Sequence, residues 1–134
     1  MAILYPIFAL LTLTLAVMVR MGIARYSAVI RREVDHHYYE VYHGEEPPHL
    51  RVLSRHFSNL VEIPPLFYIA CIIAFVTEQQ SGLVIGLAWA YVALRFLHSY
   101  IHLGRNVVAQ RFKVFVASIL VLTVLFVTLF IGIV

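Results

Sequence analysis

Four long apolar segments dominate the chain, and each has about the length of a membrane-spanning helix. A helix needs about twenty mostly apolar residues to cross a hydrocarbon core of roughly 30 Å. The pattern therefore predicts helices at about residues 2–32, 51–77, 82–104 and 108–134. We expect an all-α, integral membrane four-helix bundle that uses residues 1–134 as a single domain.

The composition agrees with this class and excludes a soluble globule. The chain is 62% hydrophobic and 13% charged, which leaves too little polar surface to cover a soluble fold of 134 residues. The first apolar segment is not expected to be a cleaved signal, because its charges follow the apolar run. The single cysteine, Cys71, excludes an intrachain disulfide and a multi-thiolate metal site.

The distribution of basic residues predicts how the helices are oriented. All Lys and Arg residues fall within 20–55 and 95–113, and the short connection at 77–82 has none. By the positive-inside rule, the loop at 33–50 and the last connection face the cytoplasm, and both termini face the opposite side. The net charge of +3 thus reports topology, and no mixture of basic and aromatic residues indicates nucleic-acid binding.

A stripe of polar side chains leads into the second apolar segment. Arg55, Asn59 and Glu62 are spaced i, i+4 and i+7, which places them on one face of a helix. A charged side chain that faces lipid costs about 2.5–3.5 kcal/mol even on a mild insertion scale. We therefore expect Glu62 to face a protein interior or a wet cavity.

The third segment supplies partners for this stripe. Arg95, His98, His102 and Arg105 also share one helix face, in the half that is predicted to be cytoplasmic. Because the second and third helices are antiparallel, both stripes reach the same depth, and we expect the cationic groups to neutralise Glu62. A positive cleft suits a ligand with carboxylates, which Arg grips through two hydrogen bonds. A guanidinium also favours the thiolate form of a nearby thiol.

The pattern Arg55-x3-Asn59-x2-Glu62-x2-Pro65 resembles the signature of the MAPEG family, the membrane-associated proteins in eicosanoid and glutathione metabolism. The four-helix layout extends the resemblance over nearly the whole chain. It implies a bacterial-type member in the inner membrane that forms a homotrimer. Glutathione, as cosubstrate, would lie between protomers near the cytoplasmic face and react with a small hydrophobic substrate from the bilayer.

The resemblance also implies roles for individual residues. Arg111 would be the catalytic residue that stabilises the glutathione thiolate. The residues that would bind or surround glutathione are Arg32, Arg55, Asn59, Glu62, Arg95, His98 and His102.

The chain departs from the family pattern around the expected thiol. His102 and Phe115 stand where the family's synthases have tyrosines, and Phe112 stands where prostaglandin synthase has a serine. Three functions therefore remain open: a glutathione-dependent transferase or peroxidase, a non-catalytic protein that binds another anionic metabolite or a lipid headgroup, and a small transporter with Glu62 in a proton relay.

A histidine-rich loop raises the question of a metal site. It contains metal-ligating residue types, but their spacing matches no compact motif. His36 and His37 are adjacent, so they are expected to point to different sides of any regular element. We therefore expect no metal and a solvated loop over the cytoplasmic face of the trimer. The ligand types in this loop are His36, His37, His43, His49, Asp35, Glu40, Glu45 and Glu46.

Overall fold

The protein is all-helical in the computed structural model, which describes residues 1–133. Four spans are long and apolar enough to cross a membrane, with α3 and α4 forming one of them. This confirms the predicted fold class, and the expected end of the last helix at residue 134 lies outside the described residues. The helices are α1 (Leu4–Ile30), α2 (Tyr38–Val41), α3 (Pro48–Glu62), α4 (Pro64–Val76), α5 (Gly82–Leu103) and α6 (Val108–Ile133).

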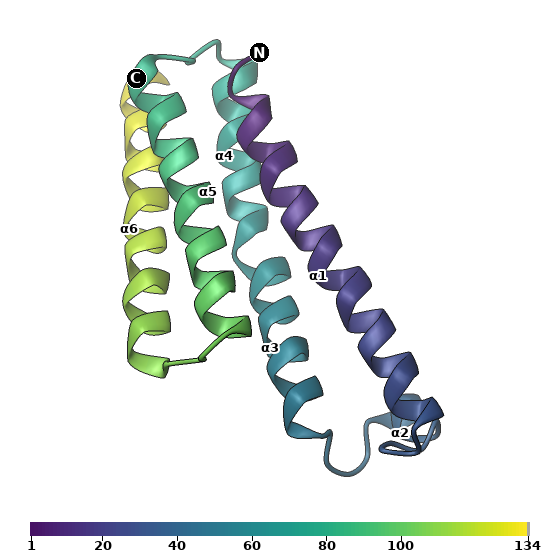
Figure 1. Ribbon diagram of the computed structural model, residues 1–134. Coiled ribbons are helices and arrows are strands. Elements are labelled where there is room, and N and C mark those ends of the chain that lie inside the picture. The colour runs from purple at the N-terminus through teal and green to yellow at the C-terminus, as the bar shows by residue number, and fades with distance from the viewer. Residues whose placement is uncertain (134) are drawn as a thin grey trace.

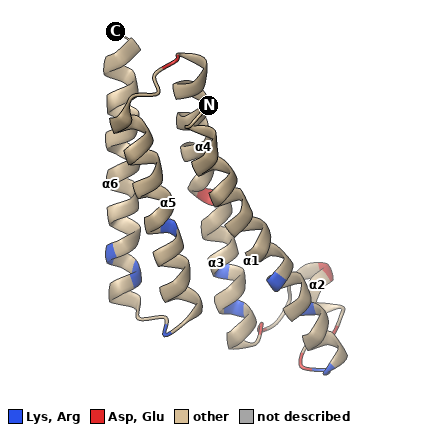
Figure 2. Ribbon diagram, turned by 45° about the horizontal axis from the view of Figure 1, so that its top comes forward, with Lys and Arg blue, Asp and Glu red and all other residues tan. Residues whose placement is uncertain are grey.

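The spans run up and down beside one another. Figure 1 shows α6, α5, the α3–α4 pair and α1 in order across the bundle, with both chain ends and the α4–α5 turn at its upper end. The loop that contains α2 and the α5–α6 connection lie at the lower end. Lys and Arg lie in the lower part of the bundle in Figure 2. The two basic connections therefore share one end, as the sequence predicts.

The second span is broken in the middle, contrary to the expectation of one continuous helix. Ile63 ends α3 and caps α4, which begins with Pro64 and Pro65. A proline has no backbone N–H to donate and its ring clashes with the preceding turn, so two prolines interrupt the helix. The break follows Glu62 directly, so α3 carries the polar stripe and α4 carries the apolar part of the span.

The first span also ends earlier than predicted. α1 stops at Ile30, and Arg32 adopts a left-handed conformation with φ 58°. The following connection holds the short helix α2, which is fixed against α1 through Arg25. The Arg25 guanidinium lies 5.4 Å from the ring centroid of Tyr39 and 5.9 Å from that of Tyr42. Part of the predicted loop is therefore anchored to the bundle.

The largest apolar cluster lies in the upper half of the bundle, and two smaller clusters around Leu53 and Leu50 lie in the lower half. The upper cluster contains four small residues that are fully buried: Cys71, Ala70, Ala74 and Ala88. The rings of Phe67 and Tyr91 stack beside them, with their centroids 4.6 Å apart. Small side chains let membrane helices approach closely.

At the lower end of α5, a side chain at Gly104 would lie 2.8 Å from the carbonyl oxygen of Tyr100, so the turn into α6 requires glycine.

Candidate functional site

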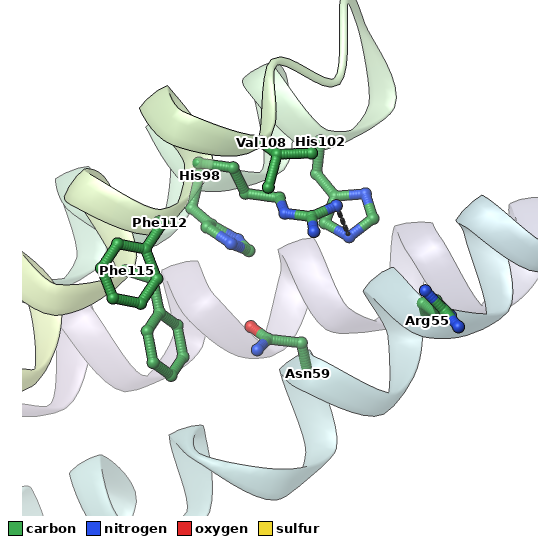
Figure 3. A pocket seen from close by; sticks show the side chains of 8 residues that line it. Arg55, Asn59, His98, His102, Val108, Phe112 and Phe115 are labelled. Carbon is green, nitrogen blue, oxygen red and sulfur yellow. Dashed lines mark hydrogen bonds between the residues drawn. The ribbon is translucent and has the colours of Figure 1, made fainter.

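A cavity of about 280 Å³ lies between α3, α5 and α6 in the basic half of the bundle. The His98 ring points into the cavity from α5, and the Asn59 amide points into it from α3 (Figure 3). The rings of Phe112 and Phe115 lie at one end of the cavity, and Arg55 lies at the other. A second hollow of about 250 Å³ shares Arg55, His102 and Arg111 with it. The cavity is lined by Arg55, Asn59, His98, His102, Val108, Arg111, Phe112 and Phe115.

Arg111 is held at the first turn of α6 by two side chains. Its Nη1 lies 3.1 Å from His102 Nε2 and donates to Asn106 Oδ1 at 2.8 Å. Because a guanidinium can only donate, His102 Nε2 must be the acceptor. His102 is therefore a neutral imidazole whose proton is on Nδ1.

Arg95 lies behind the cavity and does not line it. Its side chain is fully buried, and its Nη2 donates to the Asn59 backbone oxygen at 3.1 Å and to Asn59 Oδ1. Arg95 forms no ion pair with a carboxylate within residues 1–133. These hydrogen bonds hold the Asn59 side chain and join α3 to α5. Removing either partner would be costly, because a buried charged group would lose a hydrogen bond.

His56 belongs to the same cluster, although we did not predict it. Its side chain is fully buried on α3, and its ring centroid lies 4.9 Å from that of His102 and 5.9 Å from that of His98. Both His56 nitrogens lack a hydrogen-bond partner within residues 1–133. The sequence alone contained no clear signal for it, because His56 lies on the face of α3 that buries Leu53 and Leu60 and resembles a packing residue there.

Besides Arg95, two other predicted site residues, Glu62 and Arg32, lie outside the cavity lining in the single chain. Glu62 is exposed, so within one chain it does not share the interior with the cationic groups that were expected to neutralise it. The two side chains of Asn59 and Glu62 leave α3 in different directions. Asn59 turns toward α5, whereas Glu62, three residues later, is turned outward. Arg32 is also exposed and lines a separate hollow with Asp35 and His36.

The chemistry of the cavity is cationic on one side and apolar on the other. Two guanidinium groups and two imidazoles are present, and no carboxylate or hydroxyl side chain is among the lining residues. Such a site can bind an anion through Arg55 and Arg111 while Phe112 and Phe115 contact an apolar group.

A comparison with protein families matches the MAPEG family over residues 3–131. The chain belongs to the MAPEG family. Comparisons with curated proteins and with solved structures returned no match. The family match and the four apolar spans together make this MAPEG protein an integral, multi-pass membrane protein in contact with lipid.

The MAPEG assignment confirms the resemblance that the Arg55, Asn59 and Glu62 pattern indicated. MAPEG proteins generally use glutathione. The predicted site residues Arg55, Asn59, His98, His102 and Arg111 meet in one cavity of this MAPEG chain.

Proposed function

We propose that this protein is a glutathione-dependent transferase or peroxidase that acts on hydrophobic electrophiles or lipid hydroperoxides. The observation that supports it most strongly is the cavity that is lined by Arg55, Arg111, Asn59 and His98. Glutathione carries two carboxylates, and an arginine fork is the best side-chain match for a carboxylate. Glutathione would supply the thiol nucleophile.

Arg111 would stabilise the thiolate. The contacts to His102 and Asn106 hold its guanidinium at the cavity, and a nearby cation lowers the pKa of a thiol. His102 stands where the family's synthases have a tyrosine, and here it orients Arg111 as an acceptor. The protein would thereby align the sulfur and increase the fraction that is ionised.

Phe112 and Phe115 would form the side for the hydrophobic substrate. Phe112 is 65% exposed on α6, where it would contact the bilayer in the membrane-embedded protein. A substrate dissolved in lipid could thus reach the sulfur without crossing the aqueous phase.

The working unit would be a homotrimer with the basic end toward the cytoplasm. Glu62 on the outer surface of α3 supports the assembly, because a carboxylate facing lipid costs about 3 kcal/mol. A neighbouring protomer would cover it and complete the site for the charged ends of glutathione. The shared position of the two basic connections supports the orientation.

Calorimetric titration of detergent-purified protein with glutathione tests the proposal. We expect saturable binding that weakens about tenfold or more in R55A and in R111A, since a charge-assisted hydrogen bond contributes about 1.5–3 kcal/mol. R105A is the matched control, because Arg105 is exposed and lies outside the cavity lining. Absence of saturable binding at millimolar glutathione would exclude the proposal.

A second candidate function is binding of another anionic metabolite or a lipid headgroup without turnover. It is favoured by the absence of any Ser, Thr or Tyr side chain among the residues that line the cavity. The candidates separate by assay with chlorodinitrobenzene and with a lipid hydroperoxide. The first predicts turnover that falls in R111A, and the second predicts none in any variant.

A further inference from the structure

A cluster of metal-ligating side chains lies at the start of α2, outside the membrane spans. Asp35, His36 and His37 are all exposed, and each offers one ligand atom within 4.8 Å of the others. None of these residues lines the cavity between α3, α5 and α6. Their proximity is therefore a feature of the α1–α3 connection itself.

The two imidazoles lie on the same side of the chain, contrary to the sequence expectation. The ring centroids of His36 and His37 are 3.9 Å apart, with 39° between the ring planes. Asp35 Oδ1 accepts the backbone N–H of His37 at 2.9 Å and lies 3.2 Å from His36 Nδ1. The expectation for a regular element does not apply here, because the segment is a turn closed by Asp35.

Glu40, three residues after His37, is a fourth side chain of a metal-ligating type. Glu40 Oε1 lies 2.9 Å from His37 Nδ1. Around a tetrahedral ion with bonds of about 2.1 Å, ligand atoms lie about 3.4 Å apart. The Asp35–His36 and His37–Glu40 separations are close to that spacing, and the ligand atoms of Asp35, His36 and His37 lie within 4.8 Å of one another.

We propose that Asp35, His36, His37 and Glu40 bind a divalent transition metal ion of the class that prefers imidazole ligands, such as Zn²⁺. Two imidazoles with two carboxylates match the ligand preference of zinc and nickel. The two carboxylates balance the charge of the ion.

The segment that carries the ligands is already anchored, which lowers the entropic cost of binding. Tyr39 and Tyr42 pack against Arg25 of α1, and Arg25 reaches Ser54 of α3 at 3.0 Å. Arg32 lines the same hollow as Asp35 and His36 and opposes a cation there. We therefore expect an affinity of micromolar order, and a bound ion would fasten the turn between α1 and α2.

Calorimetric titration of untagged, chelator-treated full-length protein with zinc chloride tests the proposal. We expect one zinc ion per chain, and binding weakened about tenfold or more in H36Q/H37Q, as loss of metal ligands or their partners typically causes. H43Q/H49Q is the matched control, because it removes two histidines of the same loop outside the cluster. It is expected to retain the affinity of the unchanged protein.

Cobalt gives a second readout that does not depend on calorimetry. Co²⁺ added to the same protein should develop the intense visible bands of a tetrahedral site with nitrogen and oxygen ligands, and H36Q/H37Q should lack them. The proposal is overturned if zinc does not bind saturably, or if H43Q/H49Q loses as much affinity as H36Q/H37Q. Circular dichroism of each variant verifies the helical fold, and none of these readouts depends on glutathione.

Discussion

Arg111 on α6 donates to His102 Nε2 on α5 at 3.1 Å, and this contact joins the last two helices at the cavity. We predict that H102F lowers kcat for glutathione transfer about tenfold or more, because Arg111 loses one of two partners that orient it. The dissociation constant for glutathione should rise less than in R111A, because the Arg111 charge is still present. Steady-state kinetics and calorimetry on the same preparation separate the two effects.

The matched variant for that prediction is H102Q. A glutamine oxygen accepts a hydrogen bond from Arg111 as the imidazole does, so H102Q should retain more kcat than H102F. Equal loss in both variants would show that the acceptor at this position is unimportant.

Asn59 is the partner of the buried Arg95 guanidinium. We predict that N59L lowers the free energy of unfolding by about 1–3 kcal/mol, because a buried charged donor loses its side-chain acceptor and keeps only the backbone oxygen of residue 59. N59L/R95M should be more stable than N59L, since methionine removes the buried charge that has lost this partner. Thermal unfolding in detergent measures both, and a double variant no more stable than N59L would contradict the pairing.

Glu62 on the surface of α3 should be needed for assembly. We predict that E62A shifts the protein from the proposed trimer to smaller species, because the neighbouring protomer would lose a charged contact in a medium of low dielectric. Light scattering coupled to size-exclusion chromatography measures the mass. E78A is the control, since Glu78 is also exposed but lies in the α4–α5 turn. Unchanged mass of E62A at low protein concentration would argue against a role at the interface.

Ser54 joins α3 to both α1 and the loop. Its hydroxyl accepts from Arg25 Nη2 and donates to Glu46 Oε1, each at 3.0 Å. We predict that S54A lowers the free energy of unfolding by about 1 kcal/mol, the net value of a typical hydrogen bond. S58A removes an exposed hydroxyl from the same helix and should change stability little. Equal stability of S54A and S58A in chemical denaturation would contradict this.

Tyr39 should make stability fall at alkaline pH. Burial raises the pKa of its hydroxyl above the usual 10.0, although the Arg25 charge opposes the shift. The unfolded chain therefore loses this proton first, so the contribution to stability is present below about pH 10 and is lost as pH rises through the raised pKa. Y39F should flatten the alkaline fall of the melting temperature. Identical pH profiles of Y39F and the unchanged protein would disprove the assignment.

Much of the site was predictable because helix periodicity alone determines which residues share a stripe. The spacing of Arg55 with Asn59, and of His98 with His102, placed these side chains at one depth on two antiparallel helices. The cavity brings all four together. His56 was missed because a lone histidine among apolar positions resembles a packing residue, and only its contacts with two other rings distinguish it.

The sequence by itself determined the four apolar spans, their alternating direction and the depth of the polar residues. These follow from hydrophobicity, helix rise and the placement of charge, which are local properties of the chain. Tertiary structure decided which side of each stripe meets a neighbour, so that Asn59 faces Arg95 while Glu62 faces outward. It also brought His36 beside His37, because a turn follows its own hydrogen bonds and has no fixed period. Helix packing and turn geometry depend on contacts between distant residues, and no single-helix pattern contains them.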